Sequence, residues 1–132
     1  PIRIVLVDDH AVVRSGLAAF LLAFDDLELV GEASNGHEAI ALCESYPGTI
    51  QHMLTAVVMP GMNGKEMAER IALLKPGIHI LYMSGYTATA IAHRGVLDEG
   101  IHFLQKPFSF DALAIAVRET LDGTGDAAEG EH

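Results

Sequence analysis

The sequence predicts an α/β fold in which one doubly wound parallel sheet of five strands is covered by helices on both faces. Short apolar runs rich in β-branched residues alternate five times with segments whose apolar residues recur every three or four positions. The connecting segments are short and rich in Gly, Pro, Asn and Asp. Right-handed crossovers between such strands favour the flavodoxin-like strand order 2-1-3-4-5.

The first half of the chain supplies three strands and two helices. Strands are predicted over residues 2–7, 27–33 and 53–57, where apolar residues run together. A helix over residues 38–45 follows the turn at 34–36 and ends before Pro47-Gly48. The first helix is amphipathic, with apolar residues at Val13, Leu17, Phe20, Leu21 and Phe24.

The second half continues the alternation. A helix is predicted over residues 65–74, strands over 78–83 and 101–105, and a short helix within 88–94. Residues 123–132 are polar, so we expect residues 1–122 to form one domain and 123–132 a flexible tail. The last helix is marked by Phe110, Leu113, Val117 and Leu121.

Composition excludes several classes of protein. At 132 residues the chain is long enough for one domain with a core, and its formal charge of -10 disfavours a nucleic-acid surface. No apolar run is long enough for a membrane span, and the first residues do not show the pattern expected of a signal peptide. The single cysteine, Cys43, fits a reducing compartment. We therefore expect a cytoplasmic protein that binds neither nucleic acid nor membrane.

Polar residues follow the predicted strands at the points where a functional site is expected. Asp8 and Asp9 come directly after the first strand, Ser84 after the fourth and Lys106 after the fifth, while position 56 lies near the end of the third. The carboxyl ends of parallel strands meet at one edge, and ligands bind there at the switch between strands one and three. The sequence therefore predicts one pocket built from four loops.

Four short motifs in this order resemble the receiver domain of response regulators from two-component phosphorelay signalling. The resemblance covers residues 2–121, and any one motif alone is weak. The motifs are Val7-Asp8-Asp9, Met59-Pro60 with Asn63-Gly64, Ser84-Gly85, and Lys106-Pro107-Phe108.

The resemblance implies a Mg²⁺ site. In the family, the acidic pair and the phosphoacceptor aspartate hold the ion, helped by a backbone carbonyl that here belongs to Val58. Asp9 would be a direct ligand and Asp8 would act partly through water. Asp8 also fits a plain helix N-terminal residue, because the helix dipole favours a carboxylate there.

The resemblance also implies roles for the residues after strands four and five. Lys106 would contact the phosphoryl group, Ser84 would hydrogen-bond another of its oxygens, and Phe103 would be the aromatic that moves on activation. Without a phosphoryl group, Lys106 can pair only with Asp8 or Asp9. Each residue also has an interpretation without a signalling role. Ser84 would then lie in an ordinary turn, Lys106 would be a solvated surface lysine, and Phe103 would be a core residue. The resemblance also assigns the loop positions of the motif to Pro60, Gly64 and Pro107.

The phosphoacceptor position is occupied by Ala56. The family motif places the accepting aspartate four residues before Pro60, and a methyl group cannot carry a phosphoryl group. Nearby Thr55 should point away from the pocket by strand alternation. Three interpretations stay open: an engineered Asp→Ala change, a natural degenerate receiver, and a vestigial pocket. The intact neighbours favour a recent or engineered loss.

The predicted function is a phosphorelay receiver domain, not an enzyme, that is phosphoacceptor-null as written. The alternative is a pseudo-receiver that acts only as a protein-interaction module. A flavin-binding protein is disfavoured, because the acidic residues after strand one would repel a phosphate.

The expected partner is a histidine kinase or a histidine phosphotransfer domain. A homodimer through the fourth helix, fifth strand and fifth helix is a further option.

Residues 1–36 resemble receivers of DNA-binding response regulators, and residues from Tyr46 onward resemble receivers fused to hybrid histidine kinases. Two origins of such a mixture of subfamilies stay open, namely natural drift and deliberate fusion. The seven histidines show no pair at metal-ligand spacing, so we expect no histidine cluster of the zinc type.

Overall fold

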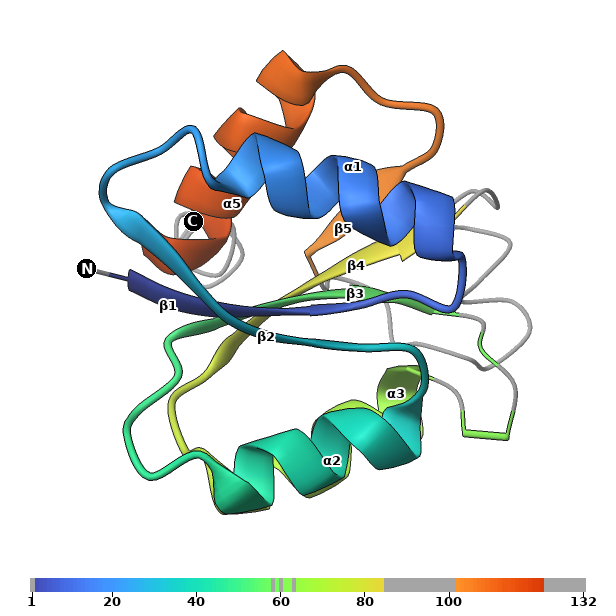
Figure 1. Cartoon of the computed structure of the whole chain (residues 1–132), viewed down its shortest axis with the longest axis vertical. Coiled ribbons are helices and arrows are strands. Elements are labelled where there is room, and N and C mark those ends of the chain that lie inside the picture. The colour runs from blue at the N-terminus through green and yellow to red at the C-terminus, as the bar shows by residue number, and fades with distance from the viewer. Residues whose placement is uncertain (1, 58, 60, 63, 85–101, 123–132) are drawn as a thin grey trace, which may run out of the picture.

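The computed structural model describes residues 2–57, 59, 61–62, 64–84 and 102–122. It forms one parallel five-stranded sheet in the order β2-β1-β3-β4-β5 (Figure 1). The predicted fold class and strand order are therefore confirmed. The strands are β1 (Ile2–Val7), β2 (Leu27–Ala33), β3 (His52–Ala56), β4 (His79–Ser84) and β5 (Phe103–Gln105).

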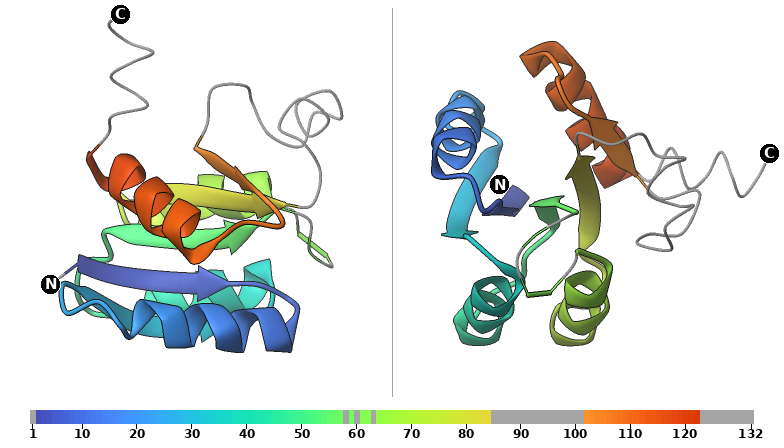
Figure 2. Two further views of the ribbon diagram at one scale, coloured as in Figure 1. Left: turned by 90° about the horizontal axis from the view of Figure 1, so that it is seen from above. Right: turned by 90° about the vertical axis from the view of Figure 1, so that its right-hand side faces the viewer.

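Helices cover both faces of the sheet. Figure 2 shows α1 and α5 on one side of the strands and α2 and α3 on the other. Within the described part of the chain, no helix is both long and apolar enough to cross a bilayer. The helices are α1 (Ala11–Leu21), α2 (Gly36–Ser45), α3 (Gly64–Leu74) and α5 (Phe110–Asp122).

Alternating strand residues supply two apolar layers. In β1, Val5 and Val7 pack in the cluster beneath α2 and α3, whereas Ile4 and Leu6 pack in the cluster beneath α1 and α5. All four side chains are fully buried. Burial on both faces explains why this strand is a continuous apolar run in the sequence.

Several predicted boundaries were wrong by a few residues. β3 and β4 are each displaced by one residue from the predicted ranges 53–57 and 78–83, and His102 precedes β5 rather than lying in it. The first helix ends before Phe24, which lies in the following turn and packs edge-on against Phe20 at 5.1 Å between ring centroids. Apolar spacing continued past the end of the helix because this turn also packs on the core. The predicted helix within 88–94 and the tail at 123–132 lie outside the described residues.

Candidate functional site

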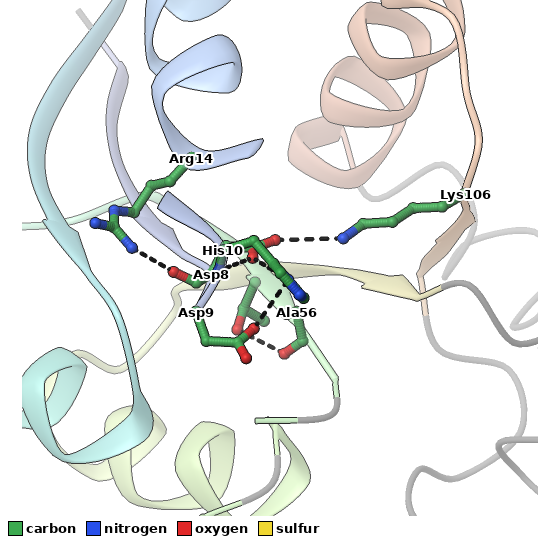
Figure 3. A network of polar contacts seen from close by, with 7 residues as sticks. Asp8, Asp9, His10, Arg14, Ala56 and Lys106 are labelled. Carbon is green, nitrogen blue, oxygen red and sulfur yellow. Dashed lines mark hydrogen bonds and ion pairs between the residues drawn. The ribbon is translucent and has the colours of Figure 1, made fainter. Parts of the chain in front are cut away.

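Asp8 lies at the centre of the polar groups at the carboxyl edge of the sheet (Figure 3). Its backbone N–H donates to the carbonyl of Ala33 at 3.1 Å, which continues the pairing of β1 with β2 beyond Val7. Its side chain is fully buried, and Oδ1 accepts the backbone N–H of His10 at 2.8 Å. Oδ2 lies 3.4 Å from Nζ of Lys106. A buried carboxylate therefore has a backbone donor on one oxygen and a cation at the other.

Arg14 supports the turn between β1 and α1. Its Nη1 donates to the backbone carbonyl of Asp8 at 2.6 Å, and its Nε lies 3.3 Å from Oε1 of Glu32. The guanidinium is therefore held by a backbone carbonyl and by β2, as Figure 3 shows for the Asp8 contact. Sequence reasoning missed this residue, although its position one turn into the helix that follows the acidic pair is a usable signal.

His10 is the second residue that sequence reasoning missed. It is the N-cap residue of α1, and its side chain is 70% exposed. Its Nδ1 atom lies 3.4 Å from Oδ1 of Asp8 and 3.4 Å from Oδ1 of Asp9. One ligand atom from each of these three residues lies within 4.8 Å of the others. The available signal was adjacency, because His10 directly follows the acidic pair.

Ala56 is the last residue of β3 and is 5% exposed. Figure 3 places it beside Asp9, at the edge where β1 and β3 end. The hydroxyl of Thr55 is fully buried and donates to the backbone carbonyl of Ala56 at 2.9 Å. The methyl group of Ala56 thus lies beside the acidic pair. The hydroxyl of Thr55 already makes a hydrogen bond to a backbone carbonyl.

The segment after β3 returns close to the strand at Gly64. The backbone N–H of Gly64 donates to the carbonyl of Val57 at 2.8 Å. A Cβ atom on Gly64 would lie 3.0 Å from the carbonyl oxygen of Ala56 and 3.2 Å from Cα of Val57. Only glycine fits this approach without moving the backbone. Val58 and Pro60, which were singled out from the sequence, lie outside the described residues.

The ends of β4 and β5 supply the other side of the site. Ser84, which is 6% exposed, accepts the backbone N–H of Lys106 at its carbonyl, at 2.8 Å. This bond holds the start of the loop after β5 against the end of β4. The peptide bond between Lys106 and Pro107 is cis. Half-buried Phe103 packs against the cluster of Val57, Ala68 and Tyr82.

The structure therefore brings Asp8, Asp9, Ala56 and Lys106 together at one edge, with Ser84 at the end of the neighbouring strand. Phe103 lies on β5 in register with Tyr82. The arrangement offers two carboxylates that can bind a cation and an ammonium group that can bind an anion.

Comparison with known proteins assigns the family. Residues 4–118 match the family model described as the response regulator receiver domain. The chain is 34% identical over 119 residues to the sensor kinase CckA of Brucella abortus, which covers 90% of this chain and 12% of that protein. It is 34% identical over 123 residues to the transcriptional regulatory protein LiaR of Bacillus subtilis, which covers 92% of this chain and 57% of LiaR. This chain thus spans only part of each relative.

Solved structures of receiver domains have the same fold as this chain. The receiver domain of the hybrid histidine kinase CckA superposes with a TM-score of 0.74 at 31% identity, covering 90% of this chain and 98% of that one. The signal receiver domain of the response regulator NarL from Mycobacterium tuberculosis gives a TM-score of 0.79 at 28% identity, covering 92% and 97%. The chain therefore belongs to the response regulator receiver domain family of two-component signalling.

Proposed function

We propose that this chain is a phosphorelay receiver domain that cannot accept a phosphoryl group as written. The observation that carries the proposal is the methyl side chain of Ala56 at the end of β3, beside Asp9, where the family motif places the accepting aspartate. The neighbouring hydroxyl of Thr55 is bonded to a backbone carbonyl and gives no substitute nucleophile. We assign the receiver to residues 1–122 and a tail to 123–132.

Asp8 and Asp9 would hold Mg²⁺ in this receiver, together with the backbone carbonyl of Val58. The fit is chemical, because Mg²⁺ prefers oxygen ligands and keeps several of its waters, so two carboxylates and a carbonyl suffice. When bound, the ion neutralises charge on a transferring phosphoryl group. The missing carboxylate at position 56 weakens the site, since one anionic ligand has gone.

Lys106 and Ser84 would contact phosphoryl oxygens in a form that carries the aspartate. The ammonium group of Lys106 already lies beside the buried carboxylate of Asp8, so it is directed into the pocket. Phe103 would be the aromatic whose packing changes on activation. The loop positions Pro60, Gly64 and Pro107 would shape the pocket, and the close approach of Gly64 to Ala56 supports that role.

The partner of this receiver would be a histidine kinase or a histidine phosphotransfer domain. Both proteins would lie in the cytoplasm, and the chain would act by binding its partner rather than as an enzyme. The retained carboxylate pair and its lysine favour a parent protein that was phosphorylated over one that never was. Self-association through the β5 and α5 face is a further proposed mode. A pseudo-receiver that docks partners without phosphorylation is the second candidate, and Ala56 itself is the observation that favours it.

Intact-mass measurement after treatment with acetyl phosphate and Mg²⁺ tests the proposal. The chain should stay unmodified, and Ala56→Asp should gain one phosphate. Ala56→Asn is the matched control, because it adds a side chain of the same shape without a nucleophilic carboxylate. A stoichiometric adduct on the unaltered chain would contradict the acceptor-null assignment. Failure of folded Ala56→Asp to gain phosphate would favour the pseudo-receiver.

A further inference from the structure

His52 is a buried imidazole at the edge of the sheet opposite the receiver pocket. It is the first residue of β3, whereas Ala56 is the last, and its exposed fraction is 0%. Within the described part of the chain, neither Nδ1 nor Nε2 of its ring has a hydrogen-bond partner. Burial of a polar group without a partner costs free energy, so these nitrogens indicate a ligand that binds at the ring.

A second imidazole lies directly opposite His52 on the neighbouring strand. His79 is the first residue of β4 and pairs with His52 in the parallel register of the two strands. The residues two positions further on, Leu54 and Leu81, both pack in the cluster beneath α1 and α5. Because side chains alternate along a strand, both imidazoles lie on that same face of the sheet. His79 is half-buried, so the pair can be reached from solvent on its side.

The imidazole of His52 is held in the neutral form that binds a metal ion. Burial, followed by the positive charges of His79 and His102, lowers the pKa of His52 to about 3. No carboxylate among the described residues contributes to this shift. The pair therefore offers nitrogen donors, which suit Zn²⁺, Cu²⁺ and Ni²⁺, whereas Mg²⁺ and Ca²⁺ take oxygen ligands.

The spacing of the two strands suits one shared ion. Neighbouring strands lie about 4.8 Å apart, and two nitrogen atoms bound to one Zn²⁺ at about 2.1 Å lie about 3.4 Å from each other. Imidazoles at opposed positions can therefore turn toward each other and reach one ion. Among the described residues, only the acidic pocket gathers three ligand atoms within 4.8 Å of one another, so the histidine site has two protein ligands.

We propose that His52 and His79 bind a divalent transition-metal ion of the Zn²⁺ class at the amino edge of the sheet, with water molecules in its remaining positions. The ion gives a buried ring nitrogen of His52 a partner and links β3 to β4. The site is separate from the pocket at Ala56, and it does not depend on phosphorylation or on the proposed function.

Isothermal titration calorimetry of the full chain with Zn²⁺, at about pH 7.5 and in millimolar Mg²⁺, tests this inference. The Mg²⁺ competes for the acidic pocket. His79→Ala and His52→Leu should each weaken Zn²⁺ binding by at least about tenfold, since losing even a residue that only orients a ligand costs 10–100-fold. The ring ¹⁵N resonances of His52 and His79 should shift on adding Zn²⁺. Zn²⁺ should also raise the melting temperature of the unaltered chain more than that of either variant.

The matched control is His37→Ala, which removes an exposed histidine from α2 and should leave the Zn²⁺ affinity unchanged. His79 is half-buried at a strand end, so His79→Ala should keep its fold even if His52→Leu does not, and circular dichroism checks this. Equal Zn²⁺ affinity of folded His79→Ala and the unaltered chain would overturn the inference, as would an equal loss in His37→Ala. Ring shifts confined to His10 would place the Zn²⁺ in the acidic pocket and would overturn it as well.

Discussion

The Nζ atom of Lys106 lies 3.4 Å from Oδ2 of Asp8, and this contact joins residues 98 positions apart in the sequence. The carboxylate is fully buried, whereas the lysine side chain is 29% exposed. The contact ties the loop after β5 to the end of β1 across the site. A buried carboxylate without a countercharge is costly, so this pair contributes to stability as well as to the pocket.

Lys106→Met should lower the free energy of unfolding by about 1–2 kcal/mol, because it removes the cation beside Oδ2 of the buried Asp8 carboxylate. In a double-mutant cycle with Asp8→Asn, measured by urea unfolding, the two changes should show a coupling of about 1 kcal/mol. Arg70→Met is the control, since it breaks only the exposed 3.6 Å pair with Glu66 and should cost under about 0.5 kcal/mol. Additive effects of the two site changes would contradict the pairing.

Restoring the carboxylate at position 56 should change how stability depends on Mg²⁺. In metal-free buffer Ala56→Asp should melt at or below the temperature of the unaltered chain, because a third carboxylate beside Asp8 and Asp9 adds like-charge repulsion. Millimolar Mg²⁺ should then raise the melting temperature of Ala56→Asp more, through tighter binding to the folded state. Thermal melts of both proteins and of Ala56→Asn decide this. Equal shifts with Mg²⁺ in all three would refute the account.

The approach of Gly64 to β3 gives a prediction about packing. Gly64→Ala should lower the free energy of unfolding by about 1–3 kcal/mol, because its Cβ would meet backbone atoms of Ala56 and Val57 at 3.0 and 3.2 Å. Gly16→Ala is the matched control within α1, where no described atom outside the helix's own backbone lies within 4 Å of the new Cβ. That change should stabilise the protein by about 0.5–1 kcal/mol, because alanine favours helix. Similar effects of the two changes in urea unfolding would show that the contact at Gly64 does not matter.

The placement of the site was predictable from the sequence because it depends on strand order. Asp8 and Lys106 follow β1 and β5, and parallel strands bring their carboxyl ends to one edge whatever the exact register. Their side chains can therefore meet at that edge of the sheet. The strand limits were less predictable, because burial continues beyond the hydrogen-bonded ladder. Val57 shows this, since it is fully buried although β3 ends at Ala56.

Contacts that depend on the rotation of a helix or on the register between strands were not predictable. The bond from Arg14 to the carbonyl of Asp8 requires knowing which side of α1 faces β2. The position of His52 opposite His79 requires the register of β3 against β4, which apolar periodicity does not specify. The expectation of no histidine cluster of the zinc type came from spacing along the chain, and such spacing carries no information about neighbours on adjacent strands.

His52 makes the stability of the protein depend on pH. It is fully buried, and neither ring nitrogen has a hydrogen-bond partner among the described residues. Burial, followed by the positive charges of His79 and His102, lowers the pKa of His52 to about 3. In the unfolded chain a histidine has a pKa of about 6.5, so between these values the unfolded state binds the extra proton. Stability should therefore fall as the pH drops below about 6.5, with the full contribution of His52 present above that value.

This contribution can be isolated with His52→Leu, which fills the buried site without a titratable group. Between pH 7 and pH 5 the unaltered chain should lose about 2 kcal/mol of unfolding free energy more than the variant does. At pH 7 the variant should be at least as stable, because it removes two buried ring nitrogens that find no hydrogen-bond partner in the described part of the chain. Urea unfolding at both pH values measures the difference, with His37→Ala as the control at an exposed position. The same loss in His52→Leu as in the unaltered chain would show that another group carries the acid sensitivity.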